Sequence, residues 1–472
     1  MVGKYLGQLA LTLAVLTLPP LGVALAYGEY ALALRFVPVI GLLAAGGAPL
    51  ARLPAPERLQ ANEALVIVAL AFVLTPAAMI WPMMGAGLSP VDAWFEAVSG
   101  VTTTGLTTLA SVSHRPHGFL FARAWLQWYG GLGIVVLSVA LLMNHQAASR
   151  RLVEVTGADT LVTTTRIHAR RVLVVYLSIT AAGAVALMAG GVNPFTGVTH
   201  ALSAVSTGGF STFDNSLAGL AAPSARWILM TVALMGAVSL PLYYRIWHGG
   251  WRVAAADAEL RALLIGCAAV SAALTGILLE GAGRAPGATA VQAVLLGVSA
   301  QTTTGFTTLS VPHLPEAAKA LLLLAMAVGG SVGSTAGGIK LLRVLSFLQL
   351  LRVTVRRTAM PAHAVAPARL GGHRLEQDDL LRALLLICLF AVVIVLSWLP
   401  FVALGYPALD ALFEVVSATA TVGLSAGITG PHLPTGLKLL LSLDMLLGRL
   451  EIIALLVVVF PATWRGKRTP SG

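Results

Sequence analysis

A short pattern of hydroxyl residues and glycine occurs four times along this chain. The copies read SGVTTTGLT from Ser99, SAVSTGGFS from Ser203, SAQTTTGFT from Ser299 and SATATVGLS from Ser417. Counted from the last glycine of each copy, serine lies six residues before it, threonine two before it, and leucine or phenylalanine one after it. Backbone carbonyls and threonine hydroxyls are oxygen ligands, so four copies around one axis could replace the hydration shell of a cation.

The segments around each copy indicate how these residues are positioned. Residues 92–103 predict a helix of about 18 Å, roughly half the hydrocarbon thickness, which can enter a membrane but not cross it. Thirteen residues before the four glycines lie Asp92, Thr196, Gln292 and Asp410, three of them residue types that cap or begin a helix. Apolar segments of spanning length precede the copies (64–84, 172–191, 262–282, 383–403) and follow them (119–143, 225–245, 318–350, 436–463).

The composition places these segments in a bilayer. Of the 472 residues 57% are hydrophobic and 10% charged, whereas soluble domains are about a quarter charged. Two further apolar segments, 5–27 and 36–50, precede the first unit, and the first of them is expected to be retained rather than cleaved as a signal peptide. The chain is therefore predicted to be an all-α polytopic membrane protein. The predicted divisions are an N-terminal two-helix hairpin (1–52) and four pseudo-fourfold span, pore-helix, span repeats around one pore (60–150, 165–250, 258–358, 376–472).

The net charge of +11 fits membrane topology better than a nucleic-acid partner. Most lysines and arginines fall in alternate loops between apolar segments, and the more basic loops face the cytoplasm. Both termini are accordingly expected inside. The two cysteines, Cys267 and Cys388, each lie within an apolar run and are expected in the core, and two such residues make neither a disulfide framework nor a metal site.

Four convergent half-helices make a cation site for an electrostatic reason. Each aims the negative end of its dipole at the common axis, and glycine allows the following backbone to turn with its carbonyls inward. Non-helical backbone at membrane depth must be buried or line a water-filled cavity. The alternative is that glycine and threonine merely allow close helix packing. Repetition in one register, each copy between two spans, favours a pore for a monovalent cation.

The four copies, the run GSVGSTAGGIK from Gly330 and the stretch MLLGRLEI from Met445 resemble the Trk/Ktr/HKT superfamily of potassium transporters. The two extra N-terminal spans and the PATWR ending resemble its TrkH branch, over essentially the whole chain. The resemblance implies a multi-pass protein of a bacterial cytoplasmic (inner) membrane that takes up K+, binds no other cofactor, and forms a homodimer with one pore per protomer. It also implies a cytosolic nucleotide-binding ring, the TrkA-type subunit, as partner.

The resemblance also implies which residues coordinate potassium in a selectivity filter. By position these are Thr103, Thr104, Gly105, Thr207, Gly208, Gly209, Thr303, Thr304, Gly305, Thr421, Val422 and Gly423. In the plant branch a serine at the first filter glycine accompanies sodium transport, so Gly105 favours potassium. The fourth copy departs most, with Val422 where two others have threonine.

A glycine-rich stretch within the second span of the third repeat is expected to be a gate. Such a segment is a poor helix, and its residues are Gly329, Gly330, Gly333, Ser334, Thr335, Gly337 and Gly338. The alternative is a GxxxG packing face. A phosphate loop is excluded, since Ile339 interrupts GK[ST] and no strand precedes it. The expected role is an intramembrane loop below the filter.

Arg449 lies inside the last apolar span, where an unpaired cation costs at least about 2.5 kcal/mol. The alternatives are a local ion pair with Asp444 or Glu451, or a place below the filter as electrostatic barrier and gate anchor. Glu96, His200 and Glu414 share one register, nine residues before the filter glycine, and are expected to support the filter from behind, since the third copy has leucine there.

The sequence bears on three function classes: a potassium pore, a membrane enzyme or other carrier, and a related pore or transporter for sodium. No HExxH, GxSxG or paired Asp-rich motif is present, and the loops are too short for a catalytic domain, which argues against an enzyme. A sodium-permeable or ion-coupled transporter of the same architecture, or another carrier, remains the alternative to potassium uptake at this point.

Overall fold

The computed structural model describes residues 2–54, 61–150, 159–280, 285–361, 369–370, 373–460 and 464. Helices dominate it, as predicted, and the described strands are one two-residue pair, β1 (Arg369–Leu370) with β2 (His373–Arg374). Among the residues described, six helices are long and apolar enough to cross a membrane, and a bent pair makes a seventh candidate. Many large apolar side chains on them are exposed, Leu42 by 76%, which suits contact with lipid. Cys267 is buried, whereas Cys388 is exposed on such a helix, so the expectation of a core position was wrong for Cys388.

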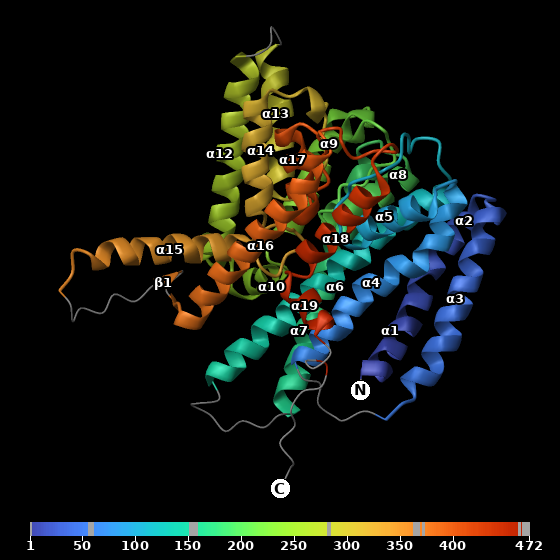
Figure 1. Cartoon of the computed structure of the whole chain (residues 1–472), viewed down its shortest axis with the longest axis horizontal. Helices are drawn as coiled ribbons and strands as arrows, with labels where there is room; N and C mark the ends of the chain where they lie inside the picture. Colours follow the sequence, from blue (N-terminus) through green and yellow to red (C-terminus); the bar gives the residue numbers. More distant parts are fainter. Residues whose placement is uncertain are drawn as a thin grey trace.

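The N-terminal segment forms α1 (Val2–Leu16), α2 (Leu18–Ala26) and α3 (Tyr30–Ala51). α1 packs along α3, with Gly7 and Gly47 against the neighbouring helix. α2 packs on α6, and the group lies at one edge of the molecule (Figure 1).

Four successive units follow, each with a long helix, a short helix and a further helix. The long helices are α4 (Ala61–Met83), α7 (Asp159–Ala189), α12 (Ala258–Glu280) and α16 (Gln377–Ala403). The short helices are α5 (Pro90–Val101), α8 (Pro194–Val205), α13 (Pro286–Gln301) and α17 (Ala408–Thr419). The third helices are α6 (His117–Arg150), α9 (Pro223–Ala237), α14 (Glu316–Val328) and α18 (Thr435–Arg449). Three 3-10 turns, η1 (Met84–Ala86), η2 (Ser216–Gly219) and η3 (Val311–His313), lie in the connections. The predicted boundaries at 1, 60 and 472, and all of the PATWR ending except Trp464, lie outside the described residues.

The short helices begin earlier than expected. Ser89 caps α5, accepting a hydrogen bond from the Asp92 amide at 3.2 Å and donating to the Asp92 carboxylate at 2.7 Å. Asn193 caps α8 in the same way, accepting from the Thr196 amide at 2.8 Å. Aspartate and threonine at the expected cap positions therefore lie in the first turn, three residues after the cap. Gln292 lies further inside α13.

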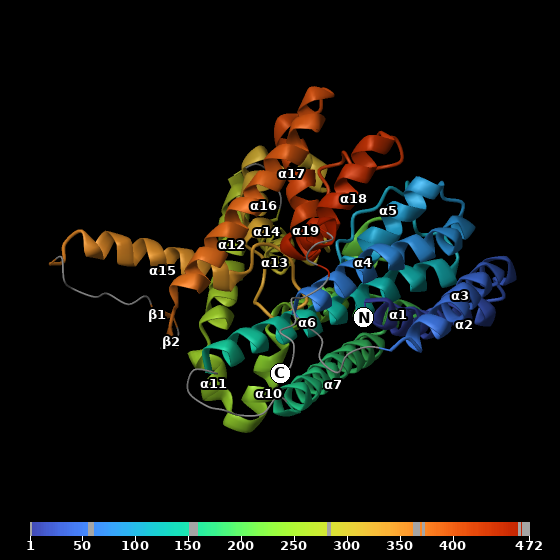
Figure 2. The same ribbon diagram turned by 60° about the horizontal axis from the view of Figure 1, so that its bottom comes forward.

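The third helix is interrupted in three of the four described units. α9 gives way to α10 (Leu240–Gly249) at a bend of 89°, followed by α11 (Trp251–Ala256). α14 and α15 (Leu341–Arg357) are separated by residues 329–340, the glycine-rich loop, and α15 projects from the body in both views (Figures 1 and 2). α18 and α19 (Ile453–Val459) are separated by residues 450–452, of which Glu451 and Ile452 have positive φ. Only the second break was expected, so single spans over 225–245 and 436–463 were wrong. Pro241, which lacks an amide hydrogen, contributes to the first break.

Candidate functional site

The four repeated turns meet in one closed ring. A Cβ added at each glycine would overlap a carbonyl oxygen of the next copy: Gly105 meets Gly208, Gly209 meets Thr304, Gly305 meets Val422, and Gly423 meets Thr104. These four glycines, named here the glycine ring, therefore each need the absence of a side chain. The four copies are therefore arranged around one axis in their order along the chain, with the fourth copy next to the first.

Each turn enters the ring through the same helix ending. In the first copy the Thr103 amide donates to the Gly100 carbonyl and the Thr104 amide to the Ser99 carbonyl, both at 2.9 Å, the two bonds of a Schellman ending. The left-handed position of that ending is usually glycine, yet here it is threonine in every copy, with φ of 57°, 50°, 55° and 51° at Thr103, Thr207, Thr303 and Thr421. A β-branched residue with positive φ is a backbone outlier. Four such outliers at one place mark these threonines as candidates for a functional role.

The repeated register of serine has a structural reason in three of the four copies, whereas the Ser299 hydroxyl has no hydrogen-bond partner among the described residues. The Ser99 hydroxyl accepts the Gly105 amide at 3.0 Å and donates to the Leu106 carbonyl at 2.6 Å, and Ser417 accepts the Gly423 amide at 3.1 Å. In the second copy Gln127 from α6 takes over. Its amide donates to the Gly208 carbonyl at 2.5 Å, and its oxygen accepts from Ser203 and from the Phe210 amide.

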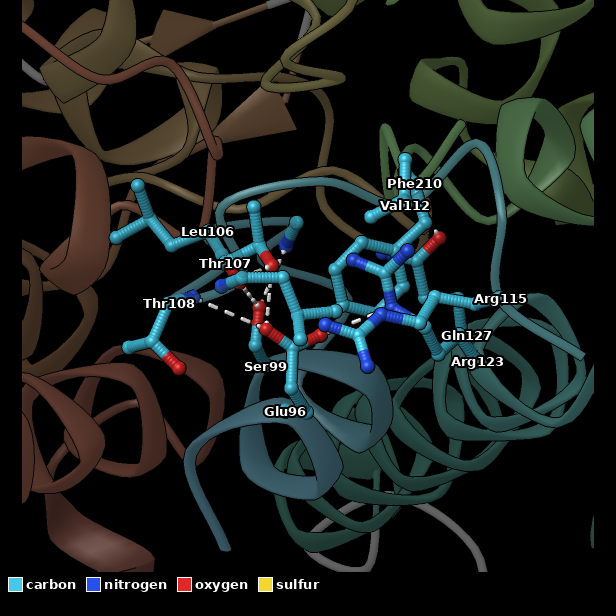
Figure 3. Close-up of polar contacts among 12 residues, drawn as sticks. Glu96, Ser99, Leu106, Thr107, Thr108, Val112, Arg115, Arg123, Gln127 and Phe210 are labelled. Atoms are coloured by element: carbon cyan, nitrogen blue, oxygen red, sulfur yellow. Dashed lines mark hydrogen bonds and ion pairs between the residues drawn. The ribbon is translucent and has the colours of Figure 1, made fainter. Parts of the chain in front are cut away.

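Glu96 connects the first turn to α6 (Figure 3). Its carboxylate accepts hydrogen bonds from the Thr107 hydroxyl and, at 3.0 Å, from the Thr108 amide, and it pairs with Arg123 at 2.9 Å. Both charged side chains are buried, and the Arg123 guanidinium also lies 3.7 Å from the Phe210 ring centroid. The first copy is therefore tied to the second from the outer side of the ring.

The other members of that register behave similarly. Glu414 accepts from Ser425 at 2.6 Å and from the Ile428 amide at 3.2 Å, and His200 lies 3.1 Å from Ser211. These hydrogen bonds confirm the prediction that Glu96, His200 and Glu414 support the turns from behind. The partner hydroxyls share a register of their own, two residues after each ring glycine, which the sequence also contains.

Ion pairs join neighbouring repeats at the starts of the short helices. Lys319 of α14 pairs with Asp410 of α17 at 2.7 Å, and Lys438 of α18 pairs with Asp92 of α5 at 2.6 Å. Both lysines are buried. Where the short helix has no acid at that register, the preceding third helix has Leu120 or Arg226, and Arg226 instead donates to the Leu220 carbonyl at 2.7 Å. The spacing alone could not reveal these pairs, because it does not say which repeat is adjacent.

The glycine-rich loop lies against one end of the ring. The Gly337 amide donates to the Thr303 hydroxyl at 2.7 Å, and a Cβ at Gly337 would overlap the Thr421 hydroxyl and the Ala420 carbonyl. Gly329, Gly333 and Gly338 all have φ of 73°. A helical GxxxG packing face is therefore excluded, because the segment is not helical.

Hydrogen bonds from the surrounding helices and within the loop hold the glycine-rich loop in place. Arg449 Nη1 donates to the Thr335 carbonyl at 2.8 Å, Gln301 to the Gly329 carbonyl at 2.9 Å, and Glu259 accepts from the Val332 amide at 2.7 Å. The Thr335 hydroxyl donates to the Val205 or Gly236 carbonyl at 2.9 Å, and the Ser334 hydroxyl to the Ser331 carbonyl at 2.6 Å. The sequence contained a signal for Gln301, a buried amide where the other copies have valine or threonine.

Arg449 is not paired locally with either acid considered for it. The Asp444 carboxylate accepts from Ser397 at 2.6 Å, and Glu451 pairs with Arg343. Nε and Nη2 of Arg449 have no hydrogen-bond partner among the described residues. Among the described residues, the Thr335 carbonyl is therefore the hydrogen-bond partner of the Arg449 guanidinium.

A cavity of 470 Å³ opens on the opposite side of the ring from the loop. The four ring glycines border it, together with Arg123 and Asp214. Asp214 crosses between repeats, accepting from the Val112 amide at 2.5 Å and the Ser111 hydroxyl at 2.8 Å. Partial burial raises the pKa of Asp214, but these hydrogen bonds outweigh it and leave the pKa below its ordinary value of 3.8. Among the described residues no group of three His, Cys, Asp or Glu side chains could hold a metal ion.

Comparison with known proteins agrees with this geometry. The family model of TrkH, described as a cation transport protein, matches residues 39–250 and 282–464. The chain is 30% identical to the Trk system potassium uptake protein TrkH of Escherichia coli strain K12, over 86% of this chain and 87% of that one. It is 32% identical to TrkH of Halomonas elongata, covering 98% and 99% of the two chains. The crystal structure of the potassium transporter TrkH from Vibrio parahaemolyticus superposes with a TM-score of 0.87 at 29% identity, covering 98% of this chain and 99% of that one. The chain therefore belongs to the TrkH family of cation transport proteins.

Proposed function

We propose that this chain takes up potassium across the cytoplasmic membrane through a pore whose selectivity filter is the glycine ring. The observation that carries the proposal is the closed ring itself, in which each glycine abuts a carbonyl oxygen of the next copy. Such a ring presents oxygen ligands to a dehydrated cation, and the four short helices end there. Relatives named as Trk system potassium uptake proteins support potassium as the ion. The twelve coordinating positions proposed are those of the four turns, 103–105, 207–209, 303–305 and 421–423.

The glycine-rich loop is the proposed gate. Gly337 lies against Thr303 and Thr421, the residues at the loop side of the ring. An ion leaving the ring toward the cytoplasm would meet this backbone and the charge of Arg449. Arg449 acts as the anchor, because its hydrogen bond to Thr335 stabilises this position of the loop.

The proposed assembly has two levels. A homodimer is supported by α15, which projects from the body and exposes Phe347, Leu348 and Leu351. A cytosolic nucleotide-binding ring of the TrkA type is supported by the words "Trk system" in relatives' names and by the basic end of α15, Arg356 and Arg357. In this arrangement both termini face the cytoplasm.

Growth of a bacterium lacking its own potassium uptake tests the proposal. Expression of this chain should restore growth at low potassium and uptake of rubidium. Gly305→Ala is the matched variant, since its Cβ would overlap the Val422 carbonyl, and it should fail while reaching the membrane at equal amounts. Sodium uptake without rubidium uptake would contradict the assignment of the ion.

A further inference from the structure

α10 crosses the direction of the helix before it. The bend between α9 and α10 is 89°, and the Tyr243 hydroxyl braces it by donating to the Met235 carbonyl at 2.8 Å. α9 belongs to a segment that enters the membrane, so a helix at right angles to it runs along the membrane plane.

The level of α10 is fixed by two neighbouring helices. The Arg171 guanidinium of α7 lies 4.0 Å from the Tyr244 ring centroid, and Arg245 pairs at 2.9 Å with Asp257, directly before α12. The apolar spans of α7 and α12 begin at Ile167 and Ala258. α10 and α11 therefore lie beside the charged ends of two spans, as Figure 2 shows.

The segment has the two faces of an interfacial helix. Leu240 and Leu242 are buried against the protein, whereas Trp247 and Trp251 are 86% and 73% exposed. Tryptophan is enriched where hydrocarbon meets headgroups. Arg252 and Arg261 are exposed on the same stretch of chain, and basic side chains at this level attract anionic headgroups.

We propose that α10, α11 and the first turn of α12 bind anionic phospholipid of the cytoplasmic leaflet, with Trp247 and Trp251 in the interface and Arg252 and Arg261 at the lipid phosphates. The cytoplasmic side rests on the proposed orientation. Lipid is favoured over a soluble partner because the exposed indoles of α10 and α11 lie beside Arg252 of α11 and Arg261 in the first turn of α12. This segment runs along the membrane at the polar ends of two spans.

The proposed lipid-binding segment also contacts the glycine-rich loop. If the proposed gate is correct, lipid binding therefore has a regulatory consequence. The Leu240 amide donates to the Gly333 carbonyl at 3.0 Å, and the Ser331 amide to the Ala237 carbonyl at 3.1 Å. Movement of α10 would therefore move the loop. Lipid bound to α10 stabilises the loop position seen here.

Tryptophan quenching in nanodiscs tests the binding. The signal of Trp247 and Trp251 is the difference between the wild type and a Trp247→Phe/Trp251→Phe variant, with Trp227→Phe on α9 as matched control. Acyl-brominated phosphatidylglycerol should quench this signal more than acyl-brominated phosphatidylcholine at equal mole fraction. Arg252→Gln should lower that preference about fivefold, since one basic residue near the surface is worth about 1 kcal/mol.

Two results would contradict lipid binding by this segment. One is quenching of these tryptophans by aqueous iodide but not by either lipid, which would place them in water and favour a protein partner. The other is equal quenching by both lipids that Arg252→Gln leaves unchanged. A separate rubidium flux measurement tests whether lipid binding is coupled to the loop. Higher flux in the double tryptophan variant supports the coupling. Lipid-selective quenching with unchanged flux contradicts the coupling but not lipid binding.

Discussion

The Gly337 amide donates a hydrogen bond to the Thr303 hydroxyl at 2.7 Å, so the glycine-rich loop contacts the ring itself. Thr103 has the same left-handed backbone and register, but its hydroxyl has no hydrogen-bond partner among the described residues. The two threonines therefore differ mainly in that one contact.

This difference yields a paired prediction. Thr303→Val removes the acceptor while keeping the β-branched shape, and should raise rubidium flux from proteoliposomes lacking any partner. Thr103→Val removes an equivalent ring hydroxyl and serves as control. A neutral hydrogen bond contributes about 0.5–1.5 kcal/mol, which corresponds to a two- to tenfold greater flux in Thr303→Val than in Thr103→Val. Equal flux in the two variants would remove this contact from the gate.

Arg449→Ala should also raise flux, by about tenfold or more. The variant loses a hydrogen bond from a charged donor to the Thr335 carbonyl, a type of bond that contributes about 1.5–3 kcal/mol. Arg449→Lys should recover part of the wild-type restraint, because the charge remains. Flux is compared at matched protein per liposome, with folding checked by gel filtration. Lower or unchanged flux in Arg449→Ala would contradict the role of gate anchor.

The fourfold ring was predictable because repetition is visible in one sequence, and glycine and threonine have few reasons to recur in one register. The broken helices after Ala237 and Arg449 were not, since an apolar run looks the same whether it is straight or bent. Ile452 has positive φ in the break after α18, a conformation that no propensity would assign to isoleucine. Tertiary packing imposes it.

The polar supports of the ring show a second limit. Gln127 and Lys438 are single polar residues within apolar segments, which marks them as candidates, but their partners lie in other repeats. Their pairing depends on the order of the repeats around the axis. That order is a property of the folded chain.

The outer connection through Asp214 predicts a dependence on pH. Its pKa is lowered in the folded protein, so the ionised form stabilises the fold above the ordinary pKa of 3.8, and this contribution disappears as the pH falls through the lower folded value. Asp214→Asn should therefore lower the melting temperature of the purified protein at pH 6, and the difference from wild type should vanish once the pH is below the lowered pKa of the folded protein. Glu316→Gln, for which no hydrogen bond to another repeat is described, is the control. A difference that persists at low pH would point to a packing effect instead.

Selection of the ion by the glycine ring can be tested at Gly105. Its φ is 94°, and a Cβ there would overlap the Gly208 carbonyl, so Gly105→Ser must displace a proposed ligand of the ion. The measurement is the reversal potential of currents from purified protein in planar bilayers with potassium on one side and sodium on the other. The wild-type protein should show a reversal potential that indicates potassium preference, and Gly105→Ser should shift it toward zero. A folded Gly105→Ser protein with unchanged relative permeability, or a wild type that does not prefer potassium, would contradict selection of the ion by the glycine ring.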